Sequence, residues 1–298
     1  MLKGRLQLQD KITGNWFLIL FLIRKCHKFI RRTGSLLLIF LNFPSEMEKL
    51  SVVIITYNEE RNIGRCLDSV QKVADEIVVL DSLSTDRTKE ICLQRGVRFF
   101  EQPFQGYIEQ ANKALDLAIY DYVLCLDADE TLTKELETSI LKEKQDFKYP
   151  GYIMNRYSNY CGKFIRFGTW YPDRKMRLFD RRKARWTGVN PHSGVKFISD
   201  EKGKWIKGDI IHYSYNTIEE HTRQNERFST ISAQSYFKLG KKSSWFKMTI
   251  NPAWAFVRCY VLRLGFLDGY YGFVIAKKVA HLTFLKYRKL YALQKQKR

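Results

Sequence analysis

The chain has 298 residues, of which 45% are hydrophobic and 28% charged, a composition that excludes a disordered protein and allows a sizeable core. The formal net charge of +20 is concentrated at the two ends: eight Lys/Arg stand against two acidic residues in 1–46, and fourteen against one in 238–298. In both ends the basic residues alternate with aromatic and aliphatic ones, which favours a membrane interface. We find no nucleic-acid-binding motif, and therefore expect no nucleic-acid partner.

The N-terminal segment 1–46 contains two apolar runs, and both are far shorter than the ~20 residues that a membrane-spanning helix requires. No small-residue cleavage site of a signal peptide follows them. We expect either a membrane-apposed extension or a segment that is not part of the natural domain. The remaining chain is predicted to form a catalytic domain over 47–237 and a basic, aromatic-rich helical segment over 238–298.

Short apolar strands and helical segments alternate from Leu50 onward. The first strand, "LSVVIITYN", is a continuous run of β-branched residues, which is typical of a strand buried on both faces. Strand–helix alternation predicts an α/β fold with a doubly wound, mostly parallel sheet. The predicted strands are 50–58, 76–81, 97–100 and 122–129, and the helix after the second is predicted to be capped by Ser84/Thr85 and to close at Gly96.

Polar side chains follow three of these strands at their carboxyl ends, which is where ligands bind in such sheets. If the fourth strand stays extended through Asp129, then Asp127 and Asp129 point the same way and Ala128 turns back into the fold. Two carboxylates at this spacing suit Mg²⁺ or Mn²⁺ carrying a substrate phosphate. The polar residues at the three strand ends are Thr56, Tyr57, Asn58, Glu59, Asp81, Ser82, Asp127 and Asp129.

Neither GxGxxG after the first strand nor GxxxxGK[ST] is present, so a dinucleotide dehydrogenase and a P-loop ATPase are not supported. The segments "SVVIITYNEERNIGRCLDSV", "EIVVLDSLSTDRTKEI" and "LCLDADE" resemble family 2 glycosyltransferases of the GT-A fold. The segments "WYPDRKMRLFDRRKARW", "GDIIHYSY" and "LRLGFLDGYYGF" resemble the bacterial subgroup that adds glucose to the lipopolysaccharide inner core. The resemblance covers roughly residues 50–290.

This resemblance implies an inverting, metal-dependent transfer of a sugar from a nucleotide sugar, with UDP as the expected nucleotide, to a glycolipid of the lipopolysaccharide core or another cell-envelope glycan. It implies that Asp127 contacts the ribose or the metal and that Asp129 is the metal ligand, for Mn²⁺ or Mg²⁺. We expect a cytoplasmic enzyme in peripheral contact with the inner face of the cytoplasmic membrane. The residues implied to cradle the nucleoside are Thr56, Asn58, Glu59 and Asp81.

Two positions depart from the pattern of the family. Leu83 replaces the usual glycine of the "DSGSTD" segment. Ser193 stands where the subgroup tends to carry an acidic residue, which is its expected catalytic base. Asp173 or His192 could substitute as the base, which is typically worth roughly 10²–10⁴-fold in rate, or the activity could be lost.

The C-terminal segment 238–298 is predicted to form two helices broken around Gly265–Gly272. Its surplus aromatic residues and its basic residues favour in-plane membrane binding. Two other functions stay open: a nucleotidyltransferase on a similar sheet, and a non-catalytic, glycosyltransferase-like lipid-binding protein. The surplus aromatic residues are Trp245, Phe246, Trp254, Tyr260, Tyr270 and Tyr271.

Overall fold

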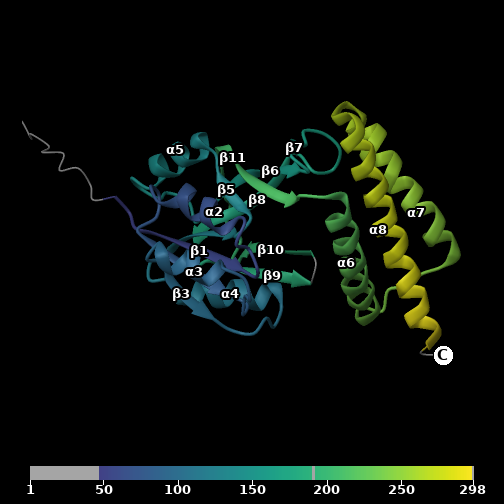
Figure 1. Cartoon of the computed structure of the whole chain (residues 1–298), viewed down its shortest axis with the longest axis horizontal. Helices are drawn as coiled ribbons and strands as arrows, with labels where there is room; N and C mark the ends of the chain where they lie inside the picture. Colours follow the sequence, from purple (N-terminus) through teal and green to yellow (C-terminus); the bar gives the residue numbers. More distant parts are fainter. Residues whose placement is uncertain (1–46, 190–191, 297–298) are drawn as a thin grey trace, which may run out of the picture. The chain divides into compact units, whose positions relative to one another are not determined.

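The computed structural model describes residues 47–189 and 192–296, so the predicted N-terminal extension 1–46 lies outside the described part. Figure 1 shows a mixed α/β body followed by helices at the C-terminal end. The strands are β1 (Leu50–Thr56), β2 (Glu76–Asp81), β3 (Arg98–Glu101), β4 (Tyr122–Asp127), β5 (Glu130–Leu132), β6 (Gly151–Tyr160), β7 (Lys163–Phe164), β8 (Asp173–Asp180), β9 (Ala184–Val189), β10 (His192–Phe197) and β11 (Lys204–Tyr215). The helices of the body are α2 (Ile63–Val70), α3 (Thr88–Gln94), α4 (Tyr107–Leu117) and α5 (Lys134–Glu143).

The main sheet has the strand order β3–β2–β1–β4–β8–β6–β11–β5, and β7 pairs with β6. Strands β3, β2, β1 and β4 are parallel neighbours, whereas β8 is antiparallel to both β4 and β6. Strands β9 and β10 form a separate antiparallel pair. The prediction of an α/β fold with a doubly wound, mostly parallel sheet and a helical C-terminal appendage is confirmed.

The first strand is buried on both faces, as its continuous apolar run predicts. One hydrophobic cluster lies on the face covered by α2 and α5 and includes Val52 and Ile54. A second cluster lies on the opposite face, under α4 and β9, and includes Val53 and Trp186. The two clusters fix the orientation of β1 and therefore the position of the polar residues that follow it.

Two local predictions were wrong. Strand β4 ends at Asp127, and Ala128 and Asp129 form a turn into β5. Ala128 is nevertheless buried in the core, as predicted. Helix α3 begins at Thr88 without a side-chain cap. Ser84 does not cap it, because the helix begins four residues later and the Ser84 hydroxyl oxygen accepts a hydrogen bond from the Asn58 backbone N–H while its proton goes to the Asp81 carboxylate.

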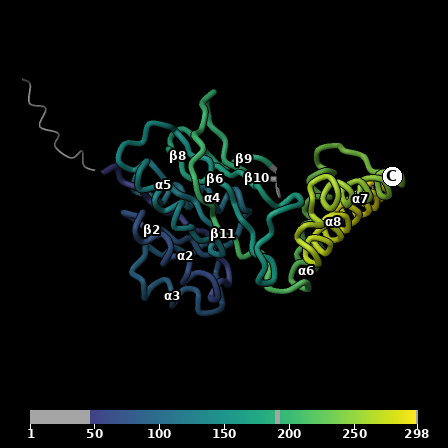
Figure 2. The backbone as a smooth tube through the Cα atoms, turned by 90° about the horizontal axis from the view of Figure 1, so that it is seen from above, coloured from purple at the N-terminus to yellow at the C-terminus, as the bar shows by residue number. Residues whose placement is uncertain are grey.

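Three long helices and two short helical segments complete the described part of the chain. Helix α8 packs against both α6 and α7, and both views show it between them (Figures 1 and 2). Because α6 lies almost entirely inside the predicted catalytic range 47–237 yet packs on α8, the helical part of the molecule begins before that range ends. The elements are α6 (Ile218–Lys238), α7 (Trp245–Val257), η1 (the π-helix Arg258–Leu262), η2 (the 3₁₀-helix Gly265–Asp268) and α8 (Gly269–Gln296).

The turn between α7 and α8 is fastened to the loop that leads into β8. The buried carboxylate of Asp268 accepts hydrogen bonds from the backbone N–H of Arg166 at 3.1 Å and of Phe167 at 2.8 Å. The turn is also tightly packed, because a Cβ on Gly272 would lie 1.8 Å from the carbonyl oxygen of Gly265. Glycine is therefore required at this close approach.

Candidate active site

The parallel register brings the ends of β1, β2 and β4 together. Thr56 is the register partner of Asp81, and Ile55 is the partner of Asp127. The Oγ1 of Thr56 is buried and has no hydrogen-bond partner within the part of the chain that the structure describes. A buried hydroxyl without a partner favours a ligand that supplies one, because leaving it unpaired costs roughly 1–3 kcal/mol.

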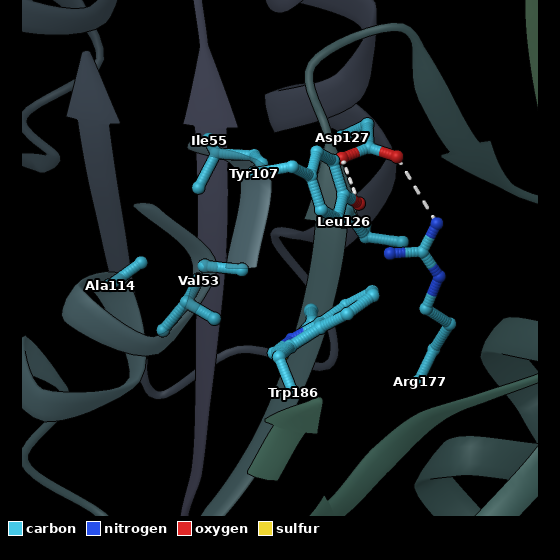
Figure 3. A pocket seen from close by; sticks show the side chains of 10 residues that line it. Val53, Ile55, Tyr107, Ala114, Leu126, Asp127, Arg177 and Trp186 are labelled. Atoms are coloured by element: carbon cyan, nitrogen blue, oxygen red, sulfur yellow. Dashed lines mark hydrogen bonds and ion pairs between the residues drawn. The ribbon is translucent and has the colours of Figure 1, made fainter. Parts of the chain in front are cut away.

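Asp127 is held by two neighbouring side chains. Figure 3 shows its carboxylate between the Tyr107 hydroxyl, at 2.9 Å, and an Arg177 nitrogen, at 3.1 Å. Burial alone would raise the pKa of Asp127, but the Arg177 charge and the Tyr107 hydrogen bond lower it below its ordinary value. Trp186 stands beneath both, in edge contact with Tyr107 at 5.3 Å and under the Arg177 guanidinium. Asp127 is therefore a fixed anion with oriented oxygens.

Glu130 extends this network inward. Its side chain is fully buried and accepts hydrogen bonds from the Asp127 backbone N–H and from Arg177, both at 3.0 Å. Burial raises the pKa of Glu130, although the Arg177 charge opposes the change. Arg156 lies 3.5 Å from the same carboxylate and also pairs with Asp173 at 2.9 Å. One chain of ion pairs thus connects Asp127 to Asp173.

Asp173, a predicted base, has both carboxylate oxygens in ion pairs. Arg156 contacts Oδ2, and Lys175 contacts Oδ1 at 3.0 Å. For His192, the other predicted base, the structure describes the backbone at the start of β10, and the side chain lies outside the described part. Ser193 follows it in β10 and pairs with Gly188 of β9.

Asp129 projects from the turn between β4 and β5 and meets a histidine from the distant strand β11. Its Oδ2 lies 3.2 Å from Nε2 of His212. The other ring nitrogen of His212 lies 2.9 Å from the Ser214 hydroxyl, which orients the ring. Burial alone would lower the pKa of His212, but the charge and hydrogen bond of Asp129 outweigh it and raise this pKa.

The pKa of Glu59 is affected by the carboxylates of the same region. Burial, followed by the charge of Asp129, raises the pKa of Glu59 to about 7, while a hydrogen bond from Asn62 opposes the change. Asp86 and Asp127 add smaller contributions in the same direction. A carboxylate whose pKa is raised by neighbouring carboxylates marks a place where a cation is stabilised.

Asn58 and Asp81 bind the loop that follows β2. Both oxygens of the buried Asp81 carboxylate accept hydrogen bonds from Ser84. The side-chain oxygen of Asn58 accepts one from the Thr85 backbone N–H at 2.8 Å. Leu83, at the centre of this loop, has φ +64°, a conformation that glycine adopts without strain and other residues rarely do. These side chains fix the loop beside the strand ends.

The donors that a divalent cation needs are present as a pair. Among residues 47–189 and 192–296, no group of three or more His, Cys, Asp or Glu side chains is arranged to hold a metal ion. Asp129 and His212 offer an oxygen and a nitrogen close together, in the negative environment that raises the Glu59 pKa. Mg²⁺ and Mn²⁺ sites of nucleotide enzymes often use one or two side chains and take their other ligands from phosphate and water. The residues therefore fit a metal that binds together with a diphosphate.

The structure adds four residues to the predicted site: Tyr107, Glu130, Arg177 and His212. Glu130 directly follows the predicted Asp pair, and His212 lies in the segment "GDIIHYSY", so the sequence contained a signal for both. Arg177 lies in the segment "WYPDRKMRLFDRRKARW", so the sequence contained a signal for it as well, although not for its contact with Asp127. Tyr107 had no such signal, because its place depends on how α4 packs against β4.

Comparison with known proteins shows the family to which the chain belongs. The model of glycosyl transferase family 2 matches residues 51–202, which run from β1 to the approach to β11. The chain belongs to this family, and the predicted family resemblance is confirmed.

The chain is similar to curated proteins and to solved structures. A protein of Rickettsia felis named an uncharacterized glycosyltransferase is 34% identical over 260 residues, which cover 82% of this chain and 90% of the relative. The lipopolysaccharide core biosynthesis glycosyltransferase LpsC of Rhizobium meliloti is 29% identical over 251 residues, which cover 81% of this chain and 92% of LpsC. Among solved structures, glucosyl-3-phosphoglycerate synthase from Mycobacterium tuberculosis, in complex with Mn²⁺, UDP and glucosyl-3-phosphoglycerate, is 24% identical, with a TM-score of 0.31 over 38% of this chain and 44% of that one.

Proposed function

We propose that this family 2 glycosyltransferase moves a sugar, with inversion, from a UDP-sugar to a hydroxyl of a lipopolysaccharide-core or other cell-envelope glycan. The observation that carries the proposal is the Asp129–His212 pair beside Asp127, at the carboxyl ends of parallel strands. The relative LpsC, named for lipopolysaccharide core biosynthesis, supports the class of acceptor. The proposal includes a glycolipid as the acceptor and the cytoplasmic face of the cytoplasmic membrane as the place of reaction.

The side chains have distinct roles in this proposal. Asp129 and His212 would hold a divalent ion, Mn²⁺ or Mg²⁺, which when bound neutralises the leaving diphosphate. Asp127, fixed by Tyr107 and Arg177, stands in reach of the ribose or of the same ion. The nucleoside side of the site is formed by Thr56 and Glu59 together with the loop that Asn58 and Asp81 hold.

Removal of the acceptor proton is assigned to Asp173 or His192, as the sequence predicts. Asp173 is connected to the site through Arg156 and Glu130, which supports its place near the reaction. Both of its oxygens are engaged in ion pairs, with Arg156 and Lys175, so as the base it would accept the sugar hydroxyl beside these contacts. A carboxylate that accepts a proton from a sugar hydroxyl contributes typically 10²–10⁴-fold.

The test compares Asp129→Ala with the unaltered enzyme and with Asp116→Ala, a control that removes an exposed aspartate on α4. Asp129→Ala should abolish turnover and weaken UDP binding in Mn²⁺ by roughly tenfold or more, since the diphosphate loses its bridge to the protein. Without metal, Asp129→Ala should bind UDP as the unaltered enzyme does. Asp116→Ala should match the unaltered enzyme in turnover and in UDP binding. Calorimetry gives the affinities, and chromatography of the released nucleotide gives the reaction.

Three outcomes would contradict the proposal. Metal-independent activity that survives Asp129→Ala would remove the metal role of this residue. Release of pyrophosphate instead of UDP would identify a nucleotidyltransferase. Tight lipid binding with no turnover of any nucleotide sugar would identify a non-catalytic lipid-binding protein.

A further inference from the structure

Large hydrophobic side chains are exposed in unusual density where α7 turns into α8. Of the 23 exposed large hydrophobic residues in the described part of the chain, twelve lie between positions 245 and 273. We name this set the α7–η2 surface. Its members are Trp245, Phe246, Ile250, Trp254, Val257, Val261, Leu262, Leu264, Phe266, Leu267, Tyr270 and Phe273.

Helix α7 contributes a continuous stripe to this surface. None of its thirteen residues is buried, although its mean composition is strongly apolar. Phe246, Ile250, Trp254 and Val257 recur at intervals of three or four residues, so they lie along one side of the helix. A contiguous exposed apolar area of this kind marks an interaction surface rather than a core.

The structure changes which aromatic residues belong to the surface. Tyr260 and Tyr271, both predicted from the sequence to contact a membrane, pack instead against the hydrophobic cluster formed around Tyr160 and Cys259. The turn contributes Leu264, Phe266 and Leu267 in their place, and these are roughly half exposed, at 45%, 45% and 53%. The surface therefore continues from α7 across the turn.

The charges around this surface are of one sign. Segment 238–298 contains a single acidic residue, Asp268, and its side chain is buried beneath the turn. Exposed basic residues adjoin the apolar ones, among them Lys247, Arg258 and Arg263. A second copy of the chain would bring like charges together, whereas an anionic surface complements them.

We propose that the α7–η2 surface docks in the plane of an anionic lipid bilayer, with its aromatic and aliphatic side chains in the interfacial layer and its lysines and arginines at the headgroups. This deepens the proposed function, on which it rests for the glycolipid acceptor, by naming the surface that contacts the membrane. No described helix is long and apolar enough to cross a membrane. Amphipathic helices with this composition bind at the interface, with an affinity that grows with buried apolar area and with anionic lipid.

The experiment measures co-sedimentation of the full chain with two kinds of vesicle, phosphatidylcholine alone and phosphatidylcholine with roughly one-third phosphatidylglycerol. The anionic vesicles should bind more tightly, and binding should weaken as salt is raised. The double variant Trp245→Ser/Trp254→Ser should lose roughly 10- to 100-fold in vesicle affinity. The matched control is Trp205→Ser, which removes a tryptophan exposed by 48% on β11 and should bind like the unaltered chain.

Two further measurements keep the result decisive. Trp245 and Trp254 are not buried, so UDP binding and the unfolding midpoint of the double variant should match the unaltered chain. Brominated lipids should quench the tryptophan fluorescence of the unaltered chain, and this requires no variant. Equal losses for the control, equal binding to neutral vesicles at every salt concentration, or a lipid-free dimer that the double variant abolishes would each overturn the proposal. A chain that binds vesicles but transfers no sugar would refute only the proposed function.

Discussion

Replacing Arg177 by methionine should lower the free energy of unfolding by roughly 3–5 kcal/mol, because it leaves buried carboxylates without their counter-charge. Arg177 is 3% exposed and contacts Asp127 at 3.1 Å and Glu130 at 3.0 Å through one nitrogen. Arg156 stays 3.5 Å from Glu130 but also pairs with Asp173, so it compensates only part of the lost charge. At roughly 2–4 °C per kcal/mol, the midpoint of thermal unfolding should fall by roughly 6–20 °C.

A second variant separates the charge from the volume of the side chain. In Arg177→Met/Glu130→Gln the uncompensated charge is removed, so most of the lost stability should return. The loss in Arg177→Met alone should grow with pH above about 4, because a Glu130 whose pKa is raised in the folded state binds protons there that the unfolded chain has released. Thermal and urea unfolding followed by circular dichroism measure both effects. A loss below about 1 kcal/mol, or a double variant no more stable than the single one, would refute the reasoning.

Three other predictions concern the buried His221, the catalytic base and the N-terminal segment. Burial and the charge of Lys278 lower the pKa of His221 to about 4. Between pH 6.5 and 4 only the unfolded chain takes up this proton, so the free energy of unfolding should fall by up to roughly 3 kcal/mol on acidification. The fall should be smaller in His221→Gln, and unfolding measured at several pH values checks this. Asp173→Asn should cut turnover by roughly 10²-fold with unchanged UDP affinity if Asp173 is the base, and His192→Gln should do so if His192 is; full activity in both would exclude both. Deleting residues 1–46 should leave a cooperatively folding domain, because the described strands of the sheet all lie after that segment, and a gain in dye binding over the full chain would contradict this.

The parallel part of the sheet could be predicted because each of its strands has a recognisable local sequence pattern. A continuous apolar run and a following polar residue define β1, β2 and β4, and the right-handed connection rule places their ends together. The partners of Asp129 could not be predicted in this way. His212 comes from β11, whose pairing with β5 brings it opposite Glu130, and no short-range pattern encodes such a register.

The two local predictions that were wrong, the Ser84 cap and the strand end at Asp129, failed for physical reasons. The sequence around Ser84 is typical of a helix cap, but α3 begins only at Thr88, and the Ser84 hydroxyl oxygen accepts from the Asn58 backbone N–H while its proton goes to Asp81. Asp127 and Asp129 looked like a matched pair on one strand, but the strand ends between them. As a result each aspartate has its own cation or imidazole partner, Arg177 for the first and His212 for the second.

The Asp268 carboxylate ties two parts of the chain that the sequence keeps about a hundred residues apart. Its bonds to the backbone of Arg166 and Phe167 make the α7–α8 turn and the loop before β8 one rigid piece. Asp173 begins β8 only a few residues beyond that loop. If the turn rests on a bilayer, as proposed above, these bonds would set the height of the start of β8 above the lipid. An acceptor hydroxyl would then be selected by its depth above the lipid as well as by its chemistry.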